Sequence, residues 1–154
     1  MEGFVMKKFK LVISLLMISV LVVGCGGGNG VGNSEPVETV KTFFQAVYES
    51  DAAKVVELID NNRVEFMKED IAKRHPESSI EEQMAGFLSL MHMSYEDMMG
   101  EKWINELRYE LKEEKRDFAT VTVDAIVDST LESFEIYLVK EDGKWKLDWE
   151  RLWS

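Results

Sequence analysis

Apolar side chains in residues 35–60 recur at the three- and four-residue spacing of amphipathic helices. A first helix is predicted to start near Pro36, because a proline fits a helix N-terminus, where its missing N–H has no partner. Asp51 is suited to cap a second, short helix, since its carboxylate accepts a hydrogen bond from a free N–H of the first turn. The apolar stripe of these two helices comprises Val37, Val40, Phe43, Phe44, Val47, Tyr48, Val55, Val56, Leu58 and Ile59.

Two further helices are predicted between residues 60 and 100. Asn61-Asn62 breaks the second helix, and a third helical segment covers residues 64–75, ending before Pro76. Ser79 and Glu82 have the spacing of a capping box, which indicates a fourth helix that runs to about Met98. Its apolar set is Met84, Phe87, Leu88, Met91 and Tyr95.

From about residue 101 the period of the hydrophobic pattern changes to two, which is typical of strands with one buried face. The predicted strands cover residues 103–112, 119–127, 134–138 and 144–150, and all four tryptophans are expected on strands. Asp142-Gly143 is a tight-hairpin signal between the last two strands. Helices followed by four consecutive strands predict an α+β fold, with the helices packed on an antiparallel sheet.

The first 34 residues have the pattern of a lipoprotein export signal. Lys7, Lys8 and Lys10 precede an uncharged apolar run over residues 11–23, which is too short to span a bilayer. Val22-Val23-Gly24-Cys25 resembles a bacterial lipobox, so we expect cleavage between Gly24 and Cys25 and acylation of the Cys25 thiol. The predicted division is therefore a signal peptide over residues 1–24, a lipidated cysteine with a glycine-rich tether over 25–34, and one domain over 35–154. The protein is expected on the extracytoplasmic side of a bacterial membrane.

The net charge of the chain bears on which partners it can bind. The whole chain carries a net charge of −11, and its only cysteine is Cys25, so an internal disulfide is impossible. The acidic residues are spread along the chain, and such a surface repels nucleic acid, whose binding needs clustered Lys and Arg. We therefore expect no nucleic-acid partner, and the lipid membrane is engaged only through the acylated Cys25.

A family resemblance follows from these elements. The helix opening over residues 36–59, the four strands and the closing Asp142–Trp149 segment (DGKWKLDW) resemble the nuclear-transport-factor-2-like (NTF2-like, cystatin-like) superfamily. Within it the chain looks most similar to lipoprotein domains of unknown function of the lumazine-binding-like type. The resemblance covers residues 35–154 and implies a curved sheet that wraps the first helix and leaves a cone-shaped pocket. It also implies that a homodimer could form through the sheet, and it brings no catalytic residues.

Four residues are candidates for lining that pocket: His92, Trp103, Asn105 and Tyr109. The sequence leaves two readings of His92 open, a core-side position on the fourth helix or the base of an isomerase- or hydrolase-type enzyme paired with a carboxylate. Asn105 either orients a polar ligand atom or is an amide near solvent. Because no catalytic motif is present, the preferred prediction is a non-enzymatic module that binds a small molecule or a protein.

Methionines are concentrated around His92, at positions 84, 91, 93, 98 and 99. Thioethers with an imidazole suit Cu(I), but methionine also fills irregular cores and adaptable binding surfaces. Met91 and Met93 would point about 200° apart on one helix, so they cannot hold the same ion while the helix is intact. We therefore predict no metal and no other cofactor.

Overall fold

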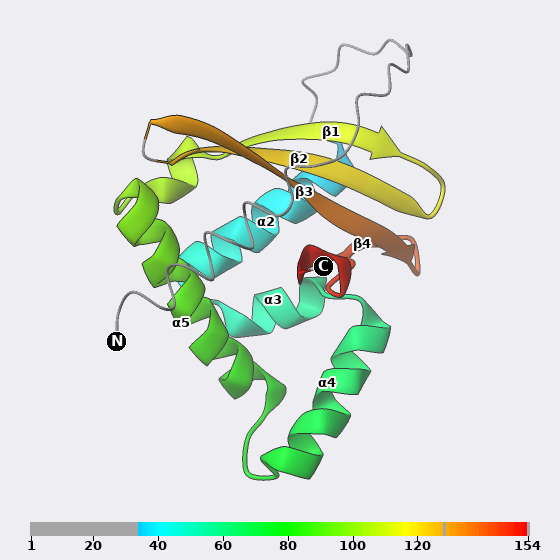
Figure 1. Ribbon diagram of the computed structural model, residues 1–154. Coiled ribbons are helices and arrows are strands. Elements are labelled where there is room, and N and C mark those ends of the chain that lie inside the picture. The colour runs from blue at the N-terminus through cyan, green and yellow to red at the C-terminus, as the bar shows by residue number, and fades with distance from the viewer. Residues whose placement is uncertain (1–33, 128, 154) are drawn as a thin grey trace. The chain divides into compact units, whose positions relative to one another are not determined.

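The computed structural model describes residues 34–127 and 129–153, which belong to one compact unit. Its four helices are α2 (Glu35–Glu49), α3 (Ala52–Leu58), α4 (Asn61–Arg74) and α5 (Ile80–Met99), and they precede the sheet in the chain. In Figure 1, α2 lies against one face of the sheet, while α3, α4 and α5 lie on the side of α2 that is away from the strands. The predictions for Gly24, Cys25 and the glycine-rich tether lie outside the described residues. None of the described helices is long and apolar enough to cross a membrane.

The predicted helix starts are confirmed by their hydrogen bonds. The Asp51 carboxylate accepts a hydrogen bond from the Lys54 N–H, and Ser79 and Glu82 form both bonds of a capping box. The second helix was predicted to break at Asn61-Asn62, but the break lies earlier, because α3 ends at Leu58 and α4 already begins at Asn61. The physical reason is Asp60, whose carboxylate caps the helix by accepting a hydrogen bond from the Arg63 N–H.

The four strands form an antiparallel sheet in the order β1-β2-β3-β4. They are β1 (Arg108–Glu114), β2 (Phe118–Val127), β3 (Thr130–Glu141) and β4 (Lys144–Leu147). The hairpin between β3 and β4 is confirmed: Asp142 and Gly143 both have positive φ, 50° and 78°, as a type I′ turn requires. These elements confirm the α+β prediction.

Two predicted strand ends are wrong. Residues Trp103–Glu106 form a 3₁₀ helix, η1, because the chain turns at Gly100 and Trp103 donates its N–H to the Gly100 carbonyl. At the other end, β4 stops at Leu147, and the Asp148 carbonyl accepts backbone hydrogen bonds that start η2 (Arg151–Trp153). Of the four tryptophans, only Trp145 therefore lies on a strand.

The core lies between α2 and the sheet. Phe44, which is 1% exposed, packs against Tyr109 of β1 and Phe134 of β3 with ring centroids about 6 Å apart. Burying such a side chain contributes roughly 1.5–3 kcal/mol. The other large side chains that are fully buried are Val40, Phe43, Val47, Val55, Ile59, Leu88, Trp103, Val121, Val123, Leu138 and Leu147.

Candidate functional site

Aromatic side chains gather around three of the four residues that were predicted to line a pocket. Trp103 is fully buried in η1 and packs on Tyr95, with ring centroids 4.7 Å apart. Tyr109 is half-buried and contacts Phe44, which also contacts Tyr95. Asn105 is exposed on η1, so it does not join this cluster. Three of the four predicted residues therefore come close through ring contacts, and the amide stays at the surface.

His92 is the third of these residues, and its surroundings are mainly aromatic. Its ring centroid lies 5.4 Å from that of Tyr48 and 6.0 Å from that of Trp103. Its Nε2 is 3.7 Å from the Glu96 carboxylate, one turn later on α5, which is too long for a hydrogen bond. Its Nδ1 is buried, and no hydrogen-bond partner for it is found among the described residues. The imidazole thus has aromatic rings on two sides and one carboxylate neighbour.

Two phenols of the aromatic cluster are held in their neutral form. Burial raises the pKa of Tyr95 to about 12. Burial, and secondarily the nearby Tyr95, raises the pKa of Tyr109 well above its usual value. Neither hydroxyl ionises near neutral pH, so both phenols present neutral hydroxyl groups to the cluster.

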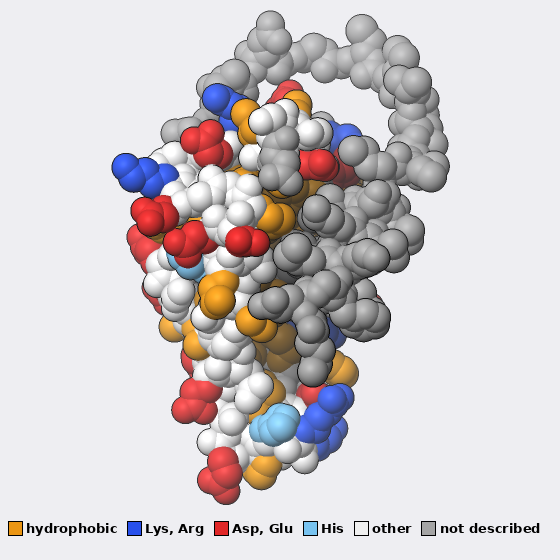
Figure 2. All heavy atoms as spheres, turned by 60° about the vertical axis from the view of Figure 1, so that its left-hand side comes forward, with side chains coloured by type: hydrophobic (Ala, Val, Ile, Leu, Met, Phe, Trp, Pro, Cys, Tyr) orange, Lys and Arg blue, Asp and Glu red, His pale blue; other side chains and the backbone are white. Residues whose placement is uncertain are grey.

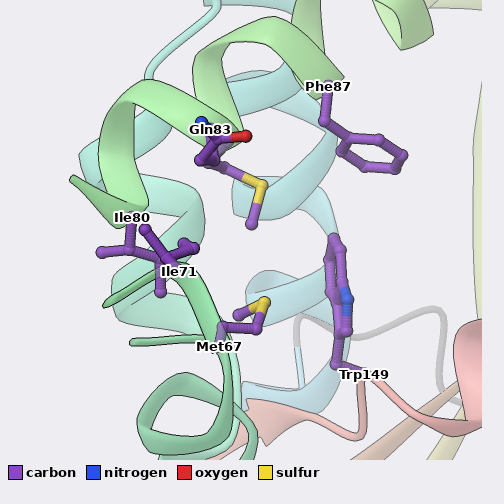
Figure 3. A pocket seen from close by; sticks show the side chains of 7 residues that line it. Met67, Ile71, Ile80, Gln83, Phe87 and Trp149 are labelled. Carbon is purple, nitrogen blue, oxygen red and sulfur yellow. The ribbon is translucent and has the colours of Figure 1, made fainter. Parts of the chain in front are cut away.

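An apolar cleft lies elsewhere, between α4, α5 and the segment that follows β4. Its volume is about 300 Å³, at the lower end of the usual range for small-molecule sites. Figure 3 shows Phe87 and Trp149 on one side of this space and Ile71 and Ile80 on the other. The lining residues are Met67, Ile71, Ile80, Gln83, Met84, Phe87 and Trp149, and we call this space the α4–α5 cleft.

Helix α4 supplies one wall of the cleft and is only lightly packed. Val64 is its one buried residue, while Met67 and Ile71 are half-buried and line the cleft. These three residues share a face because they are three and four positions apart. The wall is therefore a helix whose apolar stripe is covered at one end and open along the cleft.

Trp149 forms the opposite wall and is held from two directions. Its ring packs edge-on against Phe43 of α2, at 6.3 Å, and against Phe87 of α5, at 5.8 Å. Its backbone N–H donates to the Asp60 carboxylate over 3.3 Å, and the same carboxylate caps α4. Asp60 thus fixes the start of one wall relative to the other.

The chemistry of the α4–α5 cleft is that of binding. Gln83 is the only lining residue with a polar side chain that can both donate and accept hydrogen bonds. The thioethers of Met67 and Met84 are polarisable and adapt to different shapes. Among the described residues no group of three or more His, Cys, Asp or Glu is placed to hold a metal ion. The arrangement suits an apolar ligand with one hydrogen-bonding group.

This cleft was not among the predictions from the sequence. Its signal was present in part, because the apolar spacing of the third helix and the excess of methionine were both visible. The position of Trp149 opposite α4 could not be predicted, because it depends on contacts between residues 89 positions apart.

Comparison with solved structures relates the fold to known proteins. No protein-family model matches the sequence, and no curated protein matches it significantly. A Campylobacter jejuni protein named "Putative NTF2-like transpeptidase", with a crystal structure at 2.00 Å resolution, is similar in structure with a TM-score of 0.50 and 20% sequence identity. The match covers 74% of this chain and 97% of the other. The described domain therefore has an NTF2-like fold.

Proposed function

We propose that this chain is a lipid-anchored, extracytoplasmic binding module that takes up an apolar small molecule in the α4–α5 cleft. The observation that carries the proposal is the cleft itself: about 300 Å³ of space whose lining has only Gln83 as an amide. Apolar lining with few polar groups is the usual composition of small-molecule sites. A ligand of this class would have an alkyl or aromatic body and one group that exchanges a hydrogen bond with Gln83.

The anchoring part of the proposal comes from the sequence. The Val22–Cys25 segment has the lipobox pattern, and the mature domain is acidic, so acyl chains at Cys25 would supply the membrane attachment. Metabolic labelling with a fatty-acid analogue tests this. We expect label on the wild-type chain and none on Cys25→Ser, which should also leave the membrane fraction. Label retained by Cys25→Ser would refute the anchor without bearing on the cleft.

Binding is favoured over catalysis at His92. General acid–base chemistry needs partners placed around a reacting group, whereas His92 lies between the Tyr48 and Trp103 rings with Glu96 of its own helix as the carboxylate neighbour. An isomerase- or hydrolase-type enzyme is the alternative. It predicts turnover that a single His92→Ala substitution abolishes.

Ligand uptake is tested by titration. The full chain is held in phosphatidylcholine nanodiscs and titrated with a neutral fluorescent naphthylamine. Met67→Asp places a charge in the apolar lining, and we expect it to weaken saturable binding about tenfold or more. Phe66→Asp is the matched control, because Phe66 is the neighbouring residue on α4 and is 56% exposed outside the cleft lining. Equal losses in the two variants, or no protein-dependent saturable binding, would overturn the proposal.

Gln83→Leu refines the ligand class. It removes the amide while keeping an apolar side chain of similar size. We expect a ligand with a hydrogen-bonding group to lose affinity by about three- to tenfold, as one hydrogen bond is worth roughly 0.5–1.5 kcal/mol. A purely hydrocarbon probe should keep its affinity, and a loss for both probes would contradict the role given to Gln83.

A further inference from the structure

The side of α5 that faces away from the core is apolar at its centre. Leu90 and Met93 are 66% and 61% exposed, which is high for side chains of their size. They follow small, exposed residues, Ala85, Gly86 and Ser89, on the same side of the helix. We call these five residues the outer face of α5. Leu90 and Met93 also line a surface depression together with Ser94, Glu96 and Asp97.

Gly86 has open space beside it in the described part of the chain. A Cβ added at this position would meet nothing within 4 Å, and its φ is not in the left-handed region. A glycine in a helix interior lowers helix stability relative to alanine. A small residue on an exposed helix surface does, however, let another backbone approach closely.

Acidic residues lie at both ends of the outer face, and α5 contains no Lys or Arg. Glu82 lies before it, and Glu96 and Asp97 lie after it on the same side of the helix. Figure 2 shows hydrophobic side chains on this side of the molecule with acidic side chains above and below them. Glu82 and Glu96 are 14 positions apart, which corresponds to about 21 Å along the helix axis.

We propose that the outer face of α5 docks a helical segment of a partner protein that has an apolar stripe and Lys or Arg residues at both ends. The partner's basic residues would be about 14 positions apart, so that they meet the two acidic ends while its apolar stripe covers Leu90 and Met93. Gly86 allows the partner helix to come close. This surface is separate from the α4–α5 cleft, so the proposal does not depend on the proposed ligand.

A second copy of the chain fits this surface poorly. Two α5 helices packed in antiparallel fashion would bring Glu82 against Glu96 and Asp97, and a parallel pair would bring each acidic end against itself. Like charges brought together across an interface oppose association. The same reasoning disfavours an anionic membrane as the occupant.

The experiment uses the full chain in phosphatidylcholine nanodiscs and a synthetic helical peptide of about 18 residues with a leucine stripe and lysines about 14 residues apart. Fluorescence anisotropy measures its binding. We expect saturable binding that weakens as salt rises, because the ends of the interface are charged. A peptide with the lysines replaced by glutamates should not bind.

Variants of the chain locate the site. Gly86→Leu adds a side chain where the protein has open space, so the fold should be unaffected while peptide affinity falls about tenfold or more. The pair Leu90→Ser and Met93→Ser should cause a similar loss. Glu96→Gln should cost about two- to fivefold, the usual value of one exposed charge pair. Phe66→Asp, on the exposed side of α4, should leave peptide affinity unchanged.

Three outcomes would overturn the proposal. The first is unchanged peptide affinity in Gly86→Leu when circular dichroism shows that the variant is folded. The second is equal binding of the lysine and glutamate peptides. The third is a wild-type dimer in sedimentation that Leu90→Ser and Met93→Ser dissociate, since the occupant would then be a second copy. Met67→Asp should leave the peptide affinity unchanged, which keeps this test separate from that of the cleft.

Discussion

Asp60 connects two segments that are distant in sequence. One carboxylate oxygen accepts the Arg63 N–H at 2.9 Å and caps α4, and the other accepts the Trp149 N–H at 3.3 Å. Replacing it with alanine removes both hydrogen bonds. We expect Asp60→Ala to destabilise the domain and to loosen the two walls of the α4–α5 cleft, because both walls are fixed at this residue.

The size of the effect follows from the two bonds. Loss of a helix cap costs typically about 1 kcal/mol. The second bond is long, so it contributes at the lower end of the usual 0.5–1.5 kcal/mol. The expected change in the free energy of unfolding is therefore about 1.5–2 kcal/mol, which lowers the Tm of a domain of this size by roughly 6–8 °C.

Urea unfolding followed by tryptophan fluorescence measures this change, and titration with the naphthylamine measures the cleft. Asp60→Asn separates the two bonds, because asparagine caps helices about as well as aspartate, while its single acceptor oxygen cannot also accept the Trp149 N–H, so only the smaller share of the effect should be lost. A destabilisation by Asp60→Ala below about 0.5 kcal/mol would refute the reasoning. So would Asp60→Asn being as harmful as Asp60→Ala, because the helix cap, which asparagine keeps, would then contribute nothing.

Other predictions concern the core and pH. Leu88→Ala should cost about 2–5 kcal/mol in urea unfolding, because Leu88 is fully buried, whereas Leu90→Ala should change stability by less than about 0.5 kcal/mol. Although burial raises the pKa of Glu135, hydrogen bonds from Lys112 and Tyr137 outweigh it, so that the pKa is lowered overall. Ionised Glu135 therefore stabilises the fold fully at pH values above the pKa of the unfolded state, and this stabilisation is lost as pH falls through the pKa of the folded state. Glu135→Gln should make the free energy of unfolding less dependent on pH in this range. Burial raises the pKa of Tyr95 to about 12, so its stabilising effect is complete below the unfolded pKa of about 10 and is lost as pH rises toward 12. Tyr95→Phe should reduce the loss of stability between about pH 10 and 12. An unchanged dependence of stability on pH would contradict the role given to Tyr95.

The helices were predictable because their signals are local. A cap needs only residues three positions apart, so Asp51 and Ser79 could be identified without any knowledge of the fold. The sheet was predictable from alternation, which records a buried face directly. The error at residues 103–106 arose because Trp103 and Leu107 also suit one helical turn, being four positions apart. Alternation alone could not distinguish the two.

The site was less predictable than the fold. Trp103 and Tyr109 were predicted to line a pocket, and the sequence could not show the ring contacts that each makes, Trp103 with Tyr95 and Tyr109 with Phe44. The α4–α5 cleft depends on the distance between two helices and on Trp149. No periodicity in one segment records such a distance.

The hydrogen bond between Asp60 and Trp149 also bears on the order of folding. These residues are 89 positions apart, and closing a loop of that length costs roughly 4 kcal/mol of chain entropy. Ile59 and Leu147 form a parallel β-bridge across the same junction. The antiparallel hairpins can form first, because each joins neighbouring strands through a short turn. Helix α4 should then dock late, and it should exchange its amide protons sooner than the sheet, since the last contacts to form in folding are among the first to open.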